Sequence, residues 1–196
     1  MSLERTAPRV FFSITGAISA ALMPSWVLYL RGKYGWDIRI ALTPRAERFV
    51  TPEALSAISG NPCLTEAKWF STDGSILHRD LAANSDLVVL GPATLNSLGK
   101  LAAGICDNLA LVIPAFTDAP VVVVPSISFD VFERSKVQQM IRSLAVDGVH
   151  VMSPGQAVTL SDFNMSGGGT PTVVEFVEYV NQLGLLGEGF SSDLAR

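Results

Sequence analysis

The sequence predicts an α/β fold, in which one doubly wound parallel sheet carries helices on both faces. Short apolar runs alternate along the chain with longer segments whose apolar residues recur at helical spacing. Residues 87–90 (Leu-Val-Val-Leu) and 121–124 (four valines) are continuously apolar, as expected for strands that helices cover on both sides. Because the chain contains no repeat or interdomain linker, we expect one domain over residues 1–184 and a disordered tail over 185–196.

The first elements come from an uncharged run at residues 10–30, which follows Arg5 and Arg9. Such a run also occurs in signal peptides and membrane spans. Here it is broken by several polar, glycine and proline residues, namely Ser13, Thr15, Gly16, Ser19, Pro24 and Ser25. A β-branched and aromatic strand (9–14), a glycine turn and a helix (19–34) explain the run better. We therefore expect a soluble protein that does not enter a membrane.

The remaining elements continue the alternation. The helix at 129–146 rests on apolar residues spaced three to four apart, and the strand at 86–90 ends at Gly91-Pro92. The other predicted strands are 37–42, 68–70, 120–124 and 149–152. The other predicted helices are 52–59, 77–84, 94–103 and 172–183, with 109–116 left unassigned. Residues 153–171, which include four glycines, are expected to form a flexible insertion.

Composition limits the classes of partner. A net charge of -4 gives no broad basic field, so nucleic acid is not expected to bind. Hydrophobic residues make up 48% and charged residues 16%, which is apolar for a soluble monomer and indicates buried oligomer interfaces. Cys63 and Cys106 form neither a metal-ligand spacing nor a disulfide framework, so we expect no metal site and a reducing cytoplasm.

Two blocks carry the main functional signal: residues 91–97 (Gly-Pro-Ala-Thr-Leu-Asn-Ser) and 103–109 (Ala-Gly-Ile-Cys-Asp-Asn-Leu). They resemble the Pro-Ala-Ser-Ala-Asn-Thr and Gly-x-x-Asp-Asn-Leu signature of the homo-oligomeric flavin-containing cysteine decarboxylases. The resemblance covers residues 9–154 and is closest to decarboxylases that modify lanthipeptide, linaridin and thioamide-containing peptides. It implies a flavodoxin-like (Rossmann-like) fold, bound FMN with FAD as the alternative, and an oligomer of trimers, a dodecamer. The small residues Gly91 and Ala93 are expected to let the flat flavin ring approach the backbone.

Two further loops follow predicted strands, where doubly wound sheets bind phosphates or flavins. Residues 15–19 are close to the family's Gly-Ser-x-Ala, with Ala17 in place of the serine and Ser19 as a candidate replacement; an ordinary tight turn is the alternative. Residues 43–49 are similar to Thr/Ser-x-x-Ala/Ser-x-x-Phe, where Thr43 either caps a helix or binds phosphate with Arg45. The resemblance assigns cofactor binding to Gly16, Ala17, Ile18, Ser19, Thr43, Arg45, Phe49, Pro92, Ala93, Thr94, Asn96 and Asp107.

His78 is the predicted catalytic residue. It aligns with the family's active-site histidine, and a near-neutral imidazole can accept a thiol proton. A lone histidine is more often structural, and His150, which has no counterpart in the family, is interpreted that way. Cys106 has no base beside it in the sequence and is expected to serve packing.

Residues 125–132 depart from the family's Pro-x-Met-Asn-x-x-Met-Trp block. Ile127 and Val131 replace the two methionines, and Ser128 replaces the asparagine that binds the substrate carboxylate in relatives. The resemblance therefore leaves carboxylate binding to Ser128, to Ser126 or to the insertion at 153–171, which corresponds to the family's substrate clamp. The predicted substrate-binding residues are Ser126, Ser128, Met152 and Met165.

The resemblance implies flavin-dependent oxidative decarboxylation of the C-terminal cysteine of a ribosomal precursor peptide, giving an aminoenethiol. No cysteine follows Cys106, so the reducing clamp cysteine of coenzyme A pathway relatives is absent and an unreduced enethiol is expected. Three alternatives stay open: a phosphopantothenoylcysteine decarboxylase relative, a flavin prenyltransferase relative, and a non-catalytic regulatory subunit of the same fold. The prenyltransferase's Cys-Ser-Met is missing at residues 93–95, while His78 argues against the regulatory subunit and Ser128 argues weakly for it.

Overall fold

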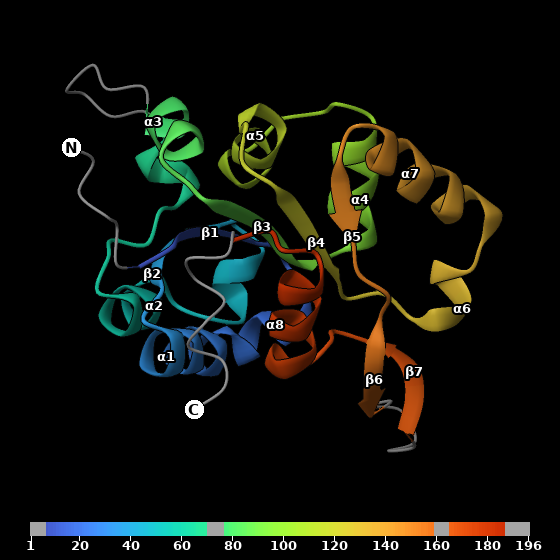
Figure 1. The fold of residues 1–196 in the computed structure, drawn as a ribbon, viewed down its shortest axis with the longest axis horizontal. Helices are drawn as coiled ribbons and strands as arrows, with labels where there is room; N and C mark the ends of the chain where they lie inside the picture. Colours follow the sequence, from blue (N-terminus) through green and yellow to red (C-terminus); the bar gives the residue numbers. More distant parts are fainter. Residues whose placement is uncertain (1–6, 70–76, 159–164, 187–196) are drawn as a thin grey trace.

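A five-stranded parallel sheet forms the centre of the molecule in the computed structural model, which describes residues 7–69, 77–158 and 165–186 (Figure 1). The strands, in the order β2-β1-β3-β4-β5, are β2 (Asp37–Leu42), β1 (Arg9–Ile14), β3 (Leu87–Ala93), β4 (Val121–Pro125) and β5 (Val149–Val151). This is the flavodoxin-like order, so the predicted fold class is confirmed. The strand order reverses at β1 and β3, which places a crevice at their carboxyl ends.

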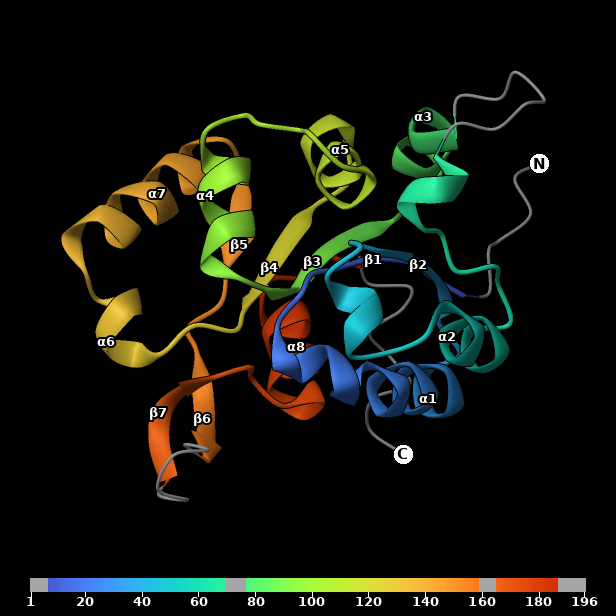
Figure 2. The same cartoon turned by 180° about the vertical axis from the view of Figure 1, so that it is seen from behind.

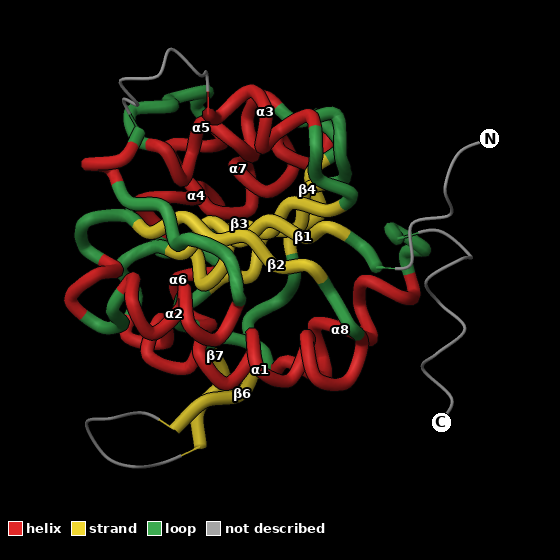
Figure 3. Tube along the Cα trace, turned by 90° about the vertical axis from the view of Figure 1, so that its left-hand side faces the viewer, coloured by secondary structure: helices red, strands yellow, loops and turns green. Residues whose placement is uncertain are grey.

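Helices cover both faces of the sheet (Figure 3). One face carries α1 (Met23–Tyr34), α2 (Pro52–Ser59) and α8 (Val173–Gln182). The other carries α3 (Leu77–Ala83), α4 (Leu95–Ala102), α5 (Leu109–Phe116) and α7 (Ser135–Val146). Neighbouring residues of β1 serve opposite faces: Phe12 packs in the core of the first face and Phe11 in that of the second, and both are fully buried. This explains why the strands are continuously apolar in sequence.

Local signals set the ends of several helices. Thr51 caps α2 by accepting a hydrogen bond from the Ala54 N–H, and Gly60 ends it in the left-handed region with φ of 72°. Thr172 and Glu175 form a reciprocal capping box at the start of α8. The two threonines therefore set where α2 and α8 begin, and Gly60 sets where α2 ends.

Two of the predicted helices are divided. Residues 18–22 form a short 3-10 helix (η1, Ile18–Leu22) before α1, which has a proline in its first turn. The predicted helix 129–146 breaks at Arg134, whose ψ of 136° is extended, into α6 (Phe129–Phe132) and α7.

The predicted strand at 68–70 is wrong where the structure describes it. Residues 66–68 form a 3-10 turn, η3 (Glu66–Lys68), and Phe70 lies outside the described residues. The chain instead touches the sheet earlier, where the Leu42 N–H donates to the Leu64 carbonyl at 2.8 Å. A single bridge of this kind leaves no apolar run from which a strand can be predicted.

β3 runs on to Ala93 instead of ending at Leu90. A Cβ on Gly91 would lie 2.7 Å from the Val124 Cβ, so this glycine allows β3 and β4 to pack closely. Ala93 is fully buried in the core beneath α4. The small size of both residues therefore serves packing within the sheet, and the approach of a flat ring to their backbone stays a prediction.

The segment expected as a flexible insertion contains two paired strands. β6 (Gly155–Val158) and β7 (Met165–Gly169) form an antiparallel hairpin that extends away from the sheet on the side of α6 (Figure 2). The unassigned residues 109–116 form α5, capped by Asn108. Most of the predicted tail, from residue 187 onward, lies outside the described residues. No helix within the described ranges is long and apolar enough to cross a bilayer.

Candidate active site

A cavity of about 580 Å³ lies at the carboxyl ends of β1, β2 and β3. This is the crevice that the strand order creates, and doubly wound sheets bind their ligands there. Its lining comes from the loops after those three strands and from the start of α5: Thr15, Gly16, Thr43, Pro44, Arg45, Thr94, Asn96, Ser97 and Asn108. Five of the twelve predicted cofactor residues therefore meet in one cavity.

Thr15 holds the floor of the cavity together. Its side chain is 1% exposed, and its hydroxyl donates to the Pro92 carbonyl at 2.7 Å while accepting from the Thr94 N–H at 3.0 Å. The Thr15 N–H also donates to Pro92, at 3.3 Å. These bonds join the ends of β1 and β3 and fix the start of α4. Thr15 belongs to the quoted loop 15–19 but was not among the predicted site residues; its position between a strand and Gly16 was the available signal.

Two helix N-termini point toward the cavity lining. At α4, the Thr94 hydroxyl accepts from the Ser97 N–H at 3.2 Å, and at α5 the Asn108 side chain accepts from the Leu111 N–H at 3.2 Å. Helix N-termini carry free N–H groups and a partial positive charge, so they favour an anionic ligand group. Ser97 and Asn108 were not predicted as site residues, although both stand inside the quoted blocks, at 91–97 and 103–109.

The loop after β2 adds a cation to the lining. The Thr43 hydroxyl accepts from the Ala46 N–H at 3.3 Å, so Thr43 does cap the following turn. Among the described residues that line the cavity, Arg45 is the one that carries a charge, and its side chain is exposed. A Cβ on Gly16 would overlap the Arg45 side-chain stem, so the glycine leaves room for this arginine. The resulting wall presents a guanidinium and a hydroxyl on the same side, a set that suits a phosphate.

Several predicted cofactor residues lie outside this lining. Ala17, Pro92 and Ala93 are buried, whereas Ile18 and Phe49 are 59% and 40% exposed. The two exposed apolar side chains are free to meet a ligand or a second subunit. Cofactor contacts for these five residues remain predictions.

Asp107 also lies outside the cavity lining. Its carboxylate pairs with the Lys100 ammonium at 2.6 Å, and this bond is the main reason that its pKa is lowered. The Asn108 amide donates to the same carboxylate at 2.9 Å. Asp107 thus orients the capping side chain of Asn108 without lining the cavity itself. Beside it, burial and the Asp107 charge raise the pKa of the Cys106 thiol, which disfavours the thiolate that a nucleophile needs.

A cluster of three hydroxyls lies beside the end of β4. Ser19 Oγ is 2.9 Å from Ser126 Oγ, and Thr170 Oγ1 donates to Ser19 Oγ at 2.6 Å. Ser19 was predicted to replace a cofactor-binding serine, and the structure directs its hydroxyl to Ser126 and to the root of the hairpin. Thr170 was not predicted, and nothing in the sequence motif marks it.

The other predicted substrate residues are dispersed. Ser128 is exposed at the start of α6 and makes no capping hydrogen bond with its side chain. Met152 is 5% exposed and packs in the core beneath α8, so little of its side chain is available to a substrate. The side chain of Met165 lies outside what the structure describes.

His78 lies in the first turn of α3, and its side chain is also outside the described part. The last turn of α3 is tied to the end of α5, because the Thr117 hydroxyl donates to the Ala82 carbonyl at 2.9 Å. A short loop then enters the amino end of β3. His78 therefore lies at the other end of α3, away from the loop that leads into β3.

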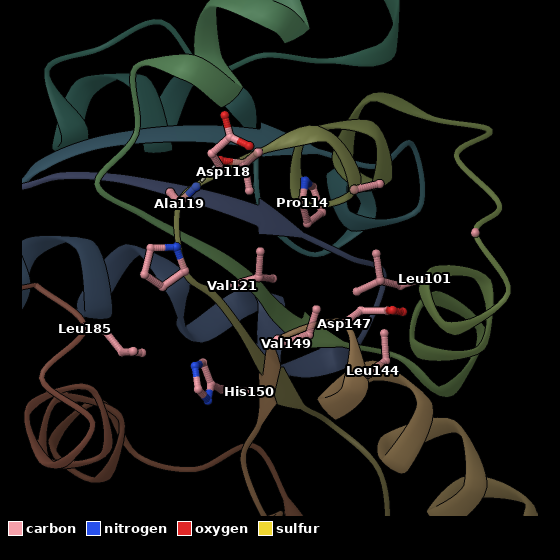
Figure 4. Close-up of a pocket in the computed structure, with 15 residues that line it drawn as sticks. Leu101, Pro114, Asp118, Ala119, Val121, Leu144, Asp147, Val149, His150 and Leu185 are labelled. Atoms are coloured by element: carbon pink, nitrogen blue, oxygen red, sulfur yellow. Dashed lines mark hydrogen bonds between the residues drawn. The ribbon is translucent and has the colours of Figure 1, made fainter.

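A second cavity, of about 560 Å³, lies at the opposite edge of the sheet (Figure 4). Val121 and Val149, at the amino ends of β4 and β5, line it together with Asp118, Asp147 and His150. Ligands of doubly wound sheets bind at the carboxyl ends, so we assign the candidate site to the first cavity. His150 is half-buried in this second lining, away from the motif residues.

The sequence profile of the family described as Flavoprotein matches residues 2–184. The chain belongs to this family. It is 32% identical over 146 residues to the coenzyme A biosynthesis bifunctional protein CoaBC of Escherichia coli K12, covering 74% of this chain but only 36% of that protein. It is 30% identical over 142 residues to the phosphopantothenoylcysteine decarboxylase of Mus musculus, covering 71% of this chain and 70% of the relative.

Solved structures agree with the fold of this flavoprotein. The crystal structure of the FMN-dependent cysteine decarboxylase TvaF from thioviridamide biosynthesis superposes with a TM-score of 0.70 at 31% identity, covering 75% of this chain and 90% of TvaF. The epidermin biosynthesis protein EpiD from Staphylococcus aureus has a TM-score of 0.74 at 22% identity, covering 87% and 99% of the two chains. The second match shows the shared fold.

Proposed function

We propose that this flavoprotein binds FMN and decarboxylates the C-terminal cysteine of a ribosomally made precursor peptide. The observation that carries the proposal is the cavity at the carboxyl edge of the sheet, where two capped helix N-termini face a wall containing Arg45 and Thr43. The similarity to TvaF, an FMN-dependent cysteine decarboxylase, supports the same chemistry.

The cavity fits FMN in size and in polarity. Its volume of about 580 Å³ lies within the usual range of small-molecule sites. Arg45, Thr43 and the loop N–H groups would hold the phosphate, and the ends of β1 and β3, joined by Thr15, would support the ring. When bound, FMN supplies a two-electron acceptor, so that the cysteine can be oxidised and its carboxylate can leave as CO2.

The chain itself supplies the proton acceptor and the orientation of the peptide. His78 is the proposed base, because a neutral imidazole can take the cysteine thiol proton near pH 7. The β6–β7 hairpin is the proposed clamp over the last residues of the peptide. β7 packs against the start of α6, where a Cβ on Gly168 would overlap the backbone of Ser128 and Phe129. The clamp therefore closes over the block that departs from the family pattern.

A peptide substrate is favoured over a coenzyme A precursor by the absence of any cysteine after Cys106, since no clamp thiol can reduce the enethiol. The competing observation is the 30% identity to the mouse phosphopantothenoylcysteine decarboxylase over most of both chains. Phosphopantothenoylcysteine is therefore the second candidate substrate. Parallel assays with both substrates decide between them.

We also propose a homo-oligomer of trimer units, a dodecamer, in which a neighbouring subunit completes the site. Exposed apolar side chains surround the cavity side of the sheet and support this assembly: Ile18, Leu22, Phe49 and Leu95. Light scattering is expected to give a mass several times that of one chain. A monomer at micromolar concentration would contradict the proposal.

The decisive experiment assays the purified protein with a synthetic peptide ending in cysteine. We expect yellow protein that releases FMN on denaturation, and a peptide product lighter by about 46 Da, from CO2 and two hydrogens. His78→Asn should keep FMN and assembly but lower the rate about 100- to 10,000-fold. The matched control Cys106→Ala, which removes a thiol assigned to packing, should keep most activity.

Three outcomes would count against the proposal. Colourless protein that binds neither FMN nor FAD rejects the flavin site. Full activity of the His78→Asn variant rejects the proposed base. Flavin-loaded protein that modifies neither peptide nor phosphopantothenoylcysteine favours the regulatory subunit of the same fold.

A further inference from the structure

The cavity at the amino edge of the sheet is nearly as large as the candidate cofactor cavity, and the proposed function does not use it. Its volume is about 560 Å³, against about 580 Å³ at the carboxyl edge. Both volumes lie within the usual range of small-molecule sites. The cavity lies where the amino ends of β4 and β5 meet the carboxyl ends of α4, α5 and α7 (Figure 4). A ligand in it would therefore be separated from the motif residues by the length of the strands.

Much of the cavity lining is apolar. Leu101, Val121 and Leu144 line it and are only 8%, 6% and 2% exposed. Val149, half-buried on the edge strand β5, belongs to the same lining. These four side chains come from α4, β4, α7 and β5, so regular elements hold them in place. Such a surface favours a ligand with an apolar body, because covering it removes apolar area from water.

Two carboxylates without a counter-charge belong to the same lining. Asp118 and Asp147 are both exposed. Within the part of the chain that the structure describes, neither side chain makes an ion pair or a hydrogen bond. The described residues that line the cavity include no lysine or arginine. In the view of Figure 4, Val121 lies between the two carboxylates. A concave site with charge of one sign favours a ligand of the opposite sign, here a cation.

The carboxyl ends of the helices add acceptors and further negative charge. A helix carries a partial negative charge at this end, where its last carbonyls lack partners within the helix. α4 and α7 each end in a backbone cap that satisfies some of these carbonyls. α5 does not: Thr117 is extended, with ψ of 145°, and no N–H of a described residue donates to the carbonyls of residues 113–116. Pro114 and Ala115 of this last turn line the cavity. Free acceptors therefore lie beside the unpaired carboxylates.

We propose that this cavity is a second binding site, which takes a small organic cation with an ammonium or guanidinium group on an apolar body. The apolar body covers Val121 and its apolar neighbours, and the cation donates hydrogen bonds to Asp118, Asp147 and the carbonyls that end α5. An ammonium group has three donors and no acceptor, so it suits a wall of carboxylates and carbonyls. The charge preference is the reverse of that at the cofactor cavity, where helix N-termini and Arg45 favour an anion. The inference goes beyond the proposed decarboxylation and does not depend on it.

The test compares three small probes with the same phenyl body: 2-phenylethylamine, a cation, 2-phenylethanol, which is neutral, and 3-phenylpropionate, an anion. Each is titrated into the purified protein with excess FMN present and is followed by NMR. We expect the amine to saturate one site per chain, with a dissociation constant of about 0.1–1 mM for a ligand of this size. The alcohol should bind about tenfold more weakly, because a charged donor makes the stronger hydrogen bonds. No saturation by the amine up to about 10 mM, or equal or tighter binding of the alcohol or the anion, overturns the inference.

The double variant Asp118→Asn/Asp147→Asn locates the site, since it keeps the size of both side chains and removes their charge. It should weaken amine binding about tenfold and change alcohol binding less than about twofold. The matched control is Glu53→Gln/Glu178→Gln, which removes two exposed carboxylates that do not line the cavity. This control has the same change in net charge and should leave amine binding within about twofold of the unmutated protein.

Two further results would overturn the assignment. Unchanged amine binding in the Asp118→Asn/Asp147→Asn variant would place the amine elsewhere on the protein. An equal loss in the Glu53→Gln/Glu178→Gln control would reduce the effect to net charge. None of these outcomes involves CO2 release, so the decarboxylase proposal stands or falls separately, on the peptide assay.

Discussion

The joint between β1 and β3 gives the sharpest prediction about the cavity. Thr15→Val keeps the shape of the side chain but removes the hydroxyl that donates to Pro92 at 2.7 Å and accepts from the Thr94 N–H at 3.0 Å. The Pro92 carbonyl keeps the bond from the Thr15 N–H at 3.3 Å, so the Thr94 N–H is the group that loses its partner. A buried donor without a partner costs about 1–3 kcal/mol. Because Thr94 is half-buried, we expect about 1–2 kcal/mol.

The free energy of unfolding is measured by urea titration followed by tryptophan fluorescence. With an m-value of about 2 kcal/mol per molar urea, the expected loss lowers the unfolding midpoint by about 0.5–1 M at constant m. Thr15 also lines the cavity, so FMN titration should show affinity reduced about tenfold, equivalent to about 1.4 kcal/mol. The two measurements separate the structural role of the hydroxyl from its effect on the ligand.

Thr117→Val is the matched control for Thr15→Val. The Thr117 hydroxyl makes the same pair of bonds, donating to Ala82 at 2.9 Å and accepting from the Ala119 N–H at 3.1 Å. It lies by the second cavity, at the amino edge of the sheet. We expect this variant to lose stability but to bind FMN as the unmutated protein does. The reasoning is refuted if both variants lose the same FMN affinity, or if Thr15→Val unfolds at the unmutated midpoint.

Three further predictions concern the frame around the site. Phe176 is fully buried against other aromatic rings, so Phe176→Ala should lower the free energy of unfolding, measured in urea, by about 3–5 kcal/mol. Gly91→Ala should lower the free energy of unfolding by about 1–3 kcal/mol, because the new Cβ overlaps Val124. The double variant with Val124→Ala should lose less than the sum of the losses of the two single variants, because the smaller side chain relieves the overlap. The hydrogen bond from Lys100 is the main reason that the pKa of Asp107 is lower in the folded than in the unfolded protein. The ionised carboxylate therefore stabilises the fold above the unfolded pKa, and this contribution is lost as the pH falls through the folded pKa. Lys100→Met should therefore flatten the fall in stability below about pH 4, and an unchanged acid profile would contradict this.

The sequence pattern predicted the sheet and most helices because the central strands β3 and β4 are buried on both faces and most helices are buried on one. It could not show the break at Arg134, because α6 and α7 pack into the same core cluster. Phe132 and Val137 lie on either side of the break and share that cluster, so the apolar spacing continues through it. The Phe132 carbonyl is satisfied by the Gln138 side chain at 2.9 Å, a bond that no spacing rule includes.

The hairpin was missed for the opposite reason. Its second strand, β7, reads Met-Ser-Gly-Gly-Gly, which has no alternation and little strand propensity. It pairs with β6 and packs on α6 through Gly168, whose φ of 119° is strained for other residues. A glycine-rich strand that is stabilised by pairing with a neighbouring strand has the sequence pattern of a loop, so the sequence predicts a loop there.

The motif residues and the contacts that position them were predictable to different degrees, and sequence separation explains the difference. Thr94 and Asn108 act locally. The side chain of each accepts a hydrogen bond from the backbone N–H three residues ahead, in the helix that it caps, so motif and structure agree. The bond from Thr15 to Thr94 joins residues 79 apart, and that from Thr170 to Ser19 joins residues 151 apart. Such contacts depend on the strand order, which brings the loops after β1, β3 and β4 to one edge. A serine or threonine at the end of a strand in a doubly wound sheet therefore shows its role only once the neighbouring strand is known.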